Sequence, residues 1–251
     1  MKKLHLLFIV SILLIIAASC KKTYNTPAAS IQPTDYLQLQ VGKYVTYRLD
    51  SLQFTNFGTQ DTIVSYQAKD VIDAAITDNL GRPSWRVIRY LSDTTGTADW
   101  VPDITYIVTA TKQDVEVVEN NLRYIKLVYP VSNGYNWAGN SYIDATSDTF
   151  NVVTYLYGWN YTYNNVAKPF TVLSGTVDST ITVIQQPDMT IGDFSNPTQF
   201  SERDYSTEVY GKGIGLIYKS FLHQEFQPPN GATSVGSTSG YGLTLNMIDH
   251  N

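Results

Sequence analysis

Cys20 is the residue whose type and position most clearly predict chemistry, because it is the only cysteine in the 251-residue chain. It follows two lysines near the start, an apolar run over residues 6–18 and one small residue. A basic start, a hydrophobic stretch and a small-residue cleavage site are typical of a secretory signal peptide. In a bacterial lipoprotein, the cysteine at that cleavage site carries the lipid. We therefore predict a lipoprotein signal peptide over residues 1–19 and acylation of Cys20, palmitate included.

The apolar run is too short for a membrane-spanning helix, which needs about 17–25 apolar residues. Two or more acyl chains are enough for stable anchoring. We therefore expect the membrane to be a partner of the mature chain through the lipid on Cys20. No other cysteine remains, so the sequence predicts neither disulfides nor cysteine-ligated metal.

A glycine-rich segment at residues 211–215 (GKGIG) could suggest a nucleotide site. Its spacing departs from G-x-G-x-x-G, because Leu216 stands where the third glycine should be. No Gly-Lys-Ser/Thr follows, so it is not a P-loop either. The segment leads into a strand pattern rather than a helix, and we interpret it as a tight turn or bulge.

Histidine and serine give no catalytic pattern. His223 and His250 are the only histidines after the signal peptide, and no His-Glu-x-x-His motif occurs. We interpret His223 as a hydrogen-bonded structural residue rather than a general base, the alternative role. Residues 236–240 (GSTSG) have threonine where a nucleophile elbow needs serine.

Paired acids could act in glycoside hydrolysis, which needs two carboxyl groups about 5–9.5 Å apart across a cleft. Three near pairs occur, namely Asp99/Asp103, Asp144/Asp148 and Glu202/Asp204. Acidic residues are seldom buried, so we interpret these as solvated. The sequence therefore predicts a protein that is not an enzyme, with no catalytic residue, no metal site and no cofactor.

Aromatic residues gather in two neighbouring segments. Trp137 lies in a glycine-containing loop, and five rings follow at alternate positions, namely Tyr155, Tyr157, Trp159, Tyr161 and Tyr163. Alternate side chains of an extended strand share one face. Such a row can stack on sugars or hold an apolar ligand, or it can be core. Trp137, Tyr157, Trp159 and Tyr161 are the candidate ligand-binding residues.

Composition narrows the class of partner. The net charge is −5, and removal of the lysine-bearing signal peptide makes the mature chain more acidic still. Nucleic-acid binding needs concentrated positive charge, so we expect no nucleic-acid partner. Only 16% of residues are charged, whereas tyrosine occurs 19 times. Tyrosine and threonine favour half-buried pleated surfaces, which indicates a β-rich fold.

Three segments organise the chain: the signal peptide, a lipidated flexible tether over residues 20–35, and one antiparallel β domain over residues 36–251. Period-two alternation recurs through the last of these, with a tight hairpin turn expected at Asn120-Asn121. The alternation extends to a terminal strand whose Leu243, Leu245 and Met247 should dock into the core. We expect a short helix near residues 197–205 and a strand over 149–157.

About nine to eleven strands result, with no long helical period between them. The fold class is therefore all-β, in a single domain. It is either a barrel or half-barrel, lipocalin-like with a ligand-sized interior, or a two-sheet sandwich.

Several segments together resemble a group of small uncharacterised lipoproteins of Bacteroidota. They are residues 41–44 (VGKY), 78–84 (DNLGRPS), 208–218 (EVYGKGIGLIY) and 240–251. The resemblance implies an outer-membrane location and brings no activity or catalytic residue. In such bacteria an acidic tag after the lipidated cysteine is associated with surface display. Residues 21–25 (KKTYN) carry no acid, which favours the periplasmic side over the cell surface.

We therefore expect a cell-envelope binding or accessory module for a hydrophobic or glycan ligand. The alternative is a structural or assembly partner of an envelope protein complex without a small ligand. A hydrolase ranks third, since it would need two acids that converge in a cleft.

Overall fold

The computed structural model describes residues 30–147, 153–231 and 235–251. Cys20, the signal peptide and most of the predicted tether lie outside these ranges. The described residues from Ile31 belong to one compact unit, Ile31–Asn251. In the described part of the chain, no helix has the length and apolarity to cross a bilayer.

One twelve-stranded sheet dominates this unit. Its strands are β1 Tyr44–Thr55, β2 Gln60–Thr77, β3 Pro83–Ser92, β4 Val101–Ala110, β5 Asp114–Glu119, β6 Leu122–Val128, β7 Asn136–Trp137, β8 Tyr161–Val172, β9 Gly175–Ile191, β10 Ser201–Gly211, β11 Gly215–Gln227 and β12 Ser237–His250. Two 3-10 turns, η1 Pro33–Tyr36 and η2 Thr154–Leu156, complete the elements described. The all-β prediction is confirmed.

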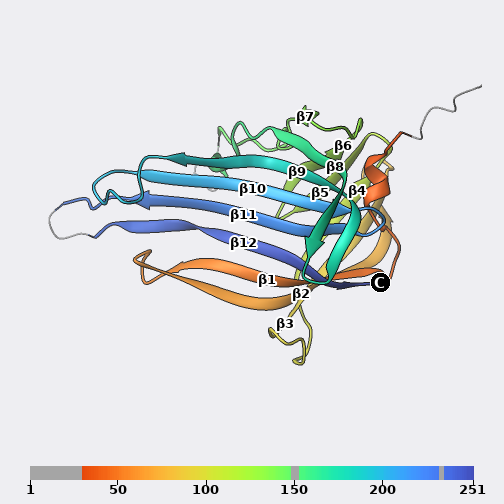
Figure 1. Ribbon diagram of the computed structural model, residues 1–251, viewed down its shortest axis with the longest axis horizontal. Coiled ribbons are helices and arrows are strands. Elements are labelled where there is room, and N and C mark those ends of the chain that lie inside the picture. Colours follow the sequence, from red (N-terminus) through yellow and green to blue (C-terminus); the bar gives the residue numbers. More distant parts are fainter. Residues whose placement is uncertain (1–29, 148–152, 232–234) are drawn as a thin grey trace, which may run out of the picture. The chain divides into compact units, whose positions relative to one another are not determined.

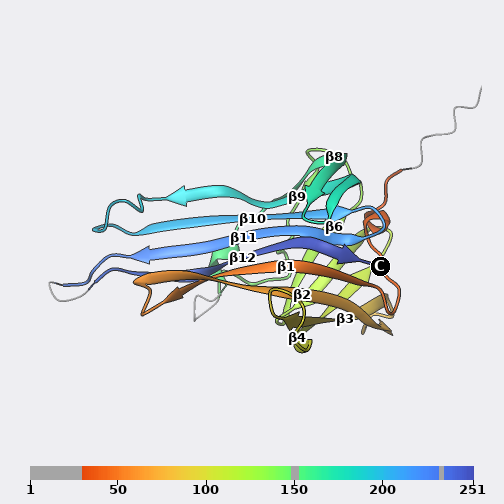
Figure 2. The ribbon, with the colours of Figure 1, turned by 60° about the horizontal axis from the view of Figure 1, so that its bottom comes forward.

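The strands pair in the order β6-β5-β4-β3-β2-β1-β12-β11-β10-β9-β8-β7, and every pair is antiparallel. The long strands β9 to β12, β1 and β2 form one broad face, and the sheet curls so that β4 to β6 run behind them near the C-terminus (Figures 1 and 2). The result is a nearly closed, barrel-like sheet rather than a two-sheet sandwich.

Side chains and a loop, instead of a strand ladder, close the sheet between its edges β6 and β7. The Ile125 N–H donates to the Gly139 carbonyl at 2.8 Å, and the Trp137 indole donates to the Ile125 carbonyl at 2.8 Å. The Tyr163 hydroxyl bonds to both backbone groups of Val128, at 2.7 and 2.8 Å. Edge β6 is therefore capped by groups from the β7–β8 region.

Local sequence explains the turns and the terminal strand. Asn120 and Asn121 have φ of 52° and 62°, as the predicted tight hairpin requires. The segment predicted as a glycine-rich turn joins β10 to β11, with φ of +70° at Gly213. Leu245 and Met247 of β12 are 1% exposed, so the predicted docking of the last strand is confirmed.

Two of the predicted secondary-structure elements are wrong. The short helix expected near 197–205 is absent, because β10 begins at Ser201 and residues 193–198 form turns. In those turns the carboxylate of Asp193 and the amide oxygen of Asn196 accept bonds from backbone N–H groups two residues on, which compete with helix formation.

The second concerns the strand expected over 149–157. Residues 148–152 lie outside the described ranges, and the rest of that segment forms the 3-10 turn η2. Leu156 is buried at 3% exposure in this turn, and the chain reverses at Gly158, whose φ is +75°.

Candidate binding site

Charged side chains lie inside the curved sheet, where a β-barrel core is usually apolar. Asp70 and Arg89 are cross-strand neighbours on β2 and β3, 6% and 7% exposed, with N–O distances of 2.6 and 2.7 Å. The Tyr106 hydroxyl donates to the same Asp70 carboxylate at 2.9 Å. The pair is thus buried with hydrogen-bonding partners, as a buried charge requires.

A second buried group centres on Glu208 of β10, which is 2% exposed. It accepts from the Lys126 ammonium at 2.8 Å and the Tyr210 hydroxyl at 2.6 Å, and Lys219 lies 3.6 Å away. Burial alone would raise the pKa of Glu208, but the two lysines outweigh it and lower the pKa to about 2. Glu208 is therefore a fixed negative charge at neutral pH.

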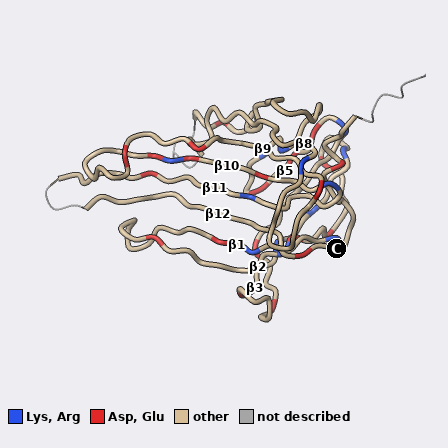
Figure 3. Tube along the Cα trace, viewed as in Figure 1, with Lys and Arg blue, Asp and Glu red and all other residues tan. Residues whose placement is uncertain are grey.

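Along the described part of the chain, charges of both signs are interspersed (Figure 3).

A cavity of about 410 Å³ lies on the inner face of the sheet. This volume is within the usual range for small-molecule sites, about 300–1,000 Å³. Its walls combine rings with polar groups, including Trp159, Tyr161, Phe221, Tyr241, Gln185 and Lys219. A smaller cavity of about 130 Å³ shares Arg89, Glu119, Lys126 and Lys219 with it.

Among the described residues that line this cavity, only Gln185 has a buried side-chain donor without a hydrogen-bond partner. It is 3% exposed, and its amide oxygen accepts from the Ser206 hydroxyl at 2.7 Å. Its amide nitrogen has no hydrogen-bond partner among the described residues. An unpaired buried donor costs roughly 1–3 kcal/mol, so this nitrogen would gain from a hydrogen-bond acceptor if the Gln185 side chain turned toward the cavity.

Rings pack together along one wall of the cavity. Phe221 stacks on Tyr241 with centroids 4.8 Å apart, and Trp159 lies 5.9 Å from Tyr155 in an edge-on contact. Tyr155 in turn stacks on His223, with centroids 4.1 Å apart and an interplanar angle of 16°. The wall thus continues from the cavity to His223.

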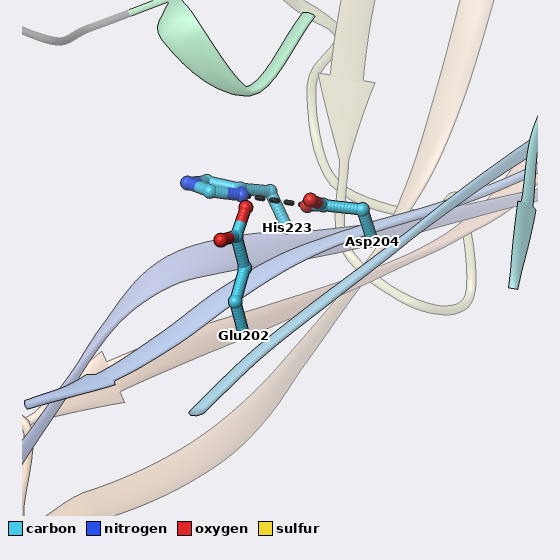
Figure 4. A group of neighbouring side chains, drawn as sticks. All are labelled: Glu202, Asp204 and His223. Carbon is cyan, nitrogen blue, oxygen red and sulfur yellow. Dashed lines mark hydrogen bonds and ion pairs between the residues drawn. The ribbon is translucent and has the colours of Figure 1, made fainter. Parts of the chain in front are cut away.

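His223 belongs to a cluster of titratable groups on β10 and β11 (Figure 4). The register pairs Asp204 with His223 and Glu202 with Glu225. The His223 Nδ1 lies 2.7 Å from the Asp204 carboxylate, and ligand atoms of Glu202, Asp204 and His223 all lie within 4.8 Å of one another. Burial and the nearby carboxyls of Asp204 and Glu225 raise the pKa of Glu202 to about 7.

The four aromatic residues that the sequence analysis proposed for ligand binding lie in different environments in the structure. Trp159 and Tyr161, 6% and 1% exposed, line the cavity, so they are core and cavity wall at once. Trp137 packs on Tyr163 and fastens the edge of β6. Tyr157 is 70% exposed in the turn after η2. The expectation of five rings on one face is therefore wrong at Tyr157, because the chain is not extended there.

Sequence reasoning noted Glu202 and Asp204 as a pair but did not join them to His223. The glycine-rich turn held only part of the signal. A hairpin centred on Gly213 places Asp204 opposite residue 222, and the bulge between Val209 and Tyr210 moves the partner to His223. The prediction that Glu202 and Asp204 are solvated is wrong, because Asp204 is 2% exposed and Glu202 is half-buried on the packed β10–β11 hairpin. Asp99, Asp103 and Asp144 are exposed, as expected, and Asp148 lies outside the described ranges.

Comparison with known protein families and with curated proteins finds no match to the sequence. Among solved structures, the fold is similar to a Bacteroides fragilis protein described as a "putative exported protein with YmcC-like fold". The TM-score is 0.34 and the identity 8%, over 89% of this chain and 100% of that chain. A likeness this distant supports no transfer of function.

Proposed function

We propose that this chain is a non-enzymatic binding module of the bacterial cell envelope and that its inner cavity holds a glycan. The observation that carries the proposal is a cavity of about 410 Å³ whose wall combines aromatic rings with polar side chains, Gln185 and Lys219 among them. Sugar rings stack on aromatic faces, while their hydroxyl oxygens accept hydrogen bonds from donors such as these side chains. The cavity offers both kinds of contact.

The lining favours a glycan over the hydrophobic ligand that the sequence left open. Glu119, Lys126 and Lys219 border the same cavity as Trp159 and Phe221. A wholly apolar ligand would displace water from these charges without replacing its hydrogen bonds, which is unfavourable. A polyhydroxylated ligand has donors and acceptors for each of them.

Placement in the envelope follows from the N-terminal sequence. The predicted acylation of Cys20 would hold the domain at the outer membrane, on the periplasmic side. Intact-mass analysis of the native protein, with fractionation of wild type and Cys20→Ser, tests this point. Recovery of unmodified protein from the cytosol would contradict it.

Calorimetry with a panel of purified neutral and acidic oligosaccharides tests the binding proposal. We expect at least one to bind, with affinity reduced in Gln185→Leu and Trp159→Phe. Tyr157→Ala, which changes an exposed ring outside the cavity lining, is the matched control and should bind as wild type. If none of the panel binds, or if all three variants bind equally, the cavity is not the site.

The convergence of Glu202 and Asp204 beside His223 favours one further candidate, glycoside hydrolysis. Retaining enzymes hold two carboxyl groups about 5–5.5 Å apart, slightly farther than the 4.8 Å limit within which these groups lie. Incubation of the same oligosaccharides with wild type and Glu202→Gln distinguishes the two: a binding module releases no new reducing ends, whereas a hydrolase releases them only with Glu202 present.

A further inference from the structure

We infer that Glu202, Asp204 and His223 form a site for one divalent transition-metal cation, and that zinc is the ion it fits best. The site is separate from the proposed glycan function, because it needs no ligand in the cavity. Two carboxylates and one imidazole converge from adjacent strands, with their ligand atoms within 4.8 Å of one another.

The strand register builds this cluster. Glu202 and Asp204 are two residues apart on β10, so their side chains share a face, and Asp204 stands opposite His223 on β11. Arg203 between the acids pairs instead with Asp188, at 2.9 and 2.7 Å. The one basic residue within this stretch of β10 is therefore engaged elsewhere.

The cluster has an excess of negative charge. Glu225, opposite Glu202, adds a third carboxylate, 3.8 Å from the His223 Nε2. Among the described residues, no lysine or arginine forms an ion pair with Glu202, Asp204 or Glu225. Asp204 is 2% exposed and its carboxylate lies 2.7 Å from the His223 Nδ1. A metal cation would supply the positive charge that a buried carboxylate needs. The buried Lys126 and the half-buried Lys219 pair with Glu208 instead.

His223 is also held in place from outside the cluster. The Tyr155 ring stacks on the imidazole at a centroid distance of 4.1 Å, and the Tyr155 hydroxyl lies 3.3 Å from that of Tyr241. Such supporting contacts orient a metal ligand before the ion arrives. Zinc bonds are about 2.0–2.2 Å long, which places its ligand atoms roughly 3.3 Å apart. Zinc binding therefore requires the half-buried Glu202 side chain to move closer to the other two ligands.

The donor set selects the class of ion. Calcium and magnesium prefer sites made of oxygen ligands, whereas imidazole suits zinc, copper, iron and nickel. Three protein ligands leave a fourth position of a zinc tetrahedron open to water or to Glu225. We therefore expect zinc to bind and calcium not to compete.

Calorimetry and metal analysis of the untagged full chain in detergent test the site with zinc chloride as the probe. We expect one zinc per chain, a higher melting temperature with zinc, and no effect of calcium. His223→Gln and Glu202→Gln should each weaken zinc binding by at least roughly tenfold, a loss seen even for outer contacts. His250→Gln removes the other described histidine, at the C-terminal end of β12, and should bind as wild type.

Cobalt provides an independent readout, since its visible spectrum reports direct ligation. We expect cobalt bands in wild type that His223→Gln lacks and His250→Gln keeps. The inference is overturned if wild type binds no stoichiometric zinc, or if the His223 variant, folded by circular dichroism, binds zinc as tightly as wild type. Neither result bears on binding of oligosaccharides in the cavity.

Discussion

The phenol oxygen of Tyr163 takes the place of a neighbouring strand for one residue of β6. It accepts from the Val128 N–H at 2.7 Å and donates to the Val128 carbonyl at 2.8 Å. Trp137 and Gly139 satisfy the two backbone groups of Ile125 in a similar way. The barrel-like sheet is thus fastened along a seam by side chains and one loop.

Tyr163→Phe should loosen this seam. The ring keeps its packing but loses both hydrogen bonds, which leaves Val128 unpaired and costs about 1–3 kcal/mol of unfolding free energy. Urea unfolding of wild type and variant measures this. Tyr157→Phe, at a residue that is 70% exposed, is the control and should unfold as wild type; equal midpoints for all three proteins would show that the seam contributes nothing.

Acid should destabilise the fold through Glu208. Its pKa in the folded protein is lowered from 4.5 to about 2, so its stabilising effect is complete above about pH 4.5 and is lost as the pH falls toward 2. One pKa unit corresponds to about 1.4 kcal/mol, so this group contributes up to roughly 3 kcal/mol. Unfolding free energies of wild type should fall across that window, and those of Glu208→Gln should fall less.

At neutral pH, Glu208→Gln should itself be destabilising by about 3–5 kcal/mol, because it leaves the buried Lys126 and the half-buried Lys219 without their anion. Asp188→Asn is the matched control, since Asp188 pairs with Arg203 in an exposed ion pair and such pairs contribute little. Equal losses in the two variants would contradict the buried role of Glu208.

Removal of the last ten residues should abolish folding. β12 lies between β1 and β11, so its loss breaks two ladders in the middle of the sheet. It also removes Leu245 and Met247, and even one such truncation to alanine costs about 2–5 kcal/mol. Circular dichroism and melting curves check this, with Leu245→Ala as the milder variant. A truncated chain with the same melting temperature as wild type would contradict the prediction.

Gly139→Ala should disturb the cavity wall, because Gly139 packs against a ring that lines the cavity. A β-carbon at this position would overlap the ring of Tyr161, which lines the cavity. Overpacking of this kind costs about 1–3 kcal/mol, and displacement of the ring should weaken oligosaccharide binding as well. Melting curves and calorimetry measure the two effects; Ala138→Ser, at the exposed neighbouring residue, should change neither.

The period-two alternation of apolar and polar residues was enough to predict the sheet and the inward face of β12. Both features depend only on residues that are two positions apart in one strand. Tyr157 was misplaced because period-two spacing holds only where the backbone is extended, and a 3-10 turn precedes it.

The candidate site was harder to predict, because its parts come from distant strands. Lys126 meets Glu208 across 82 positions of sequence, and no local pattern marks that contact. The cluster at His223 depends on a one-residue bulge in the β10–β11 hairpin. Closure of the sheet depends on where the hydroxyl of Tyr163 reaches, which strand periodicity does not specify.

The seam between β6 and β7 has a consequence for the behaviour of this chain in a crowded compartment. Unpaired strand edges are templates on which other molecules add and aggregate. Here Trp137, Tyr163 and the Gly139 carbonyl occupy backbone groups of Ile125 and Val128 on edge β6 that a second copy would need. Strand addition at this edge is blocked by contacts within the molecule itself.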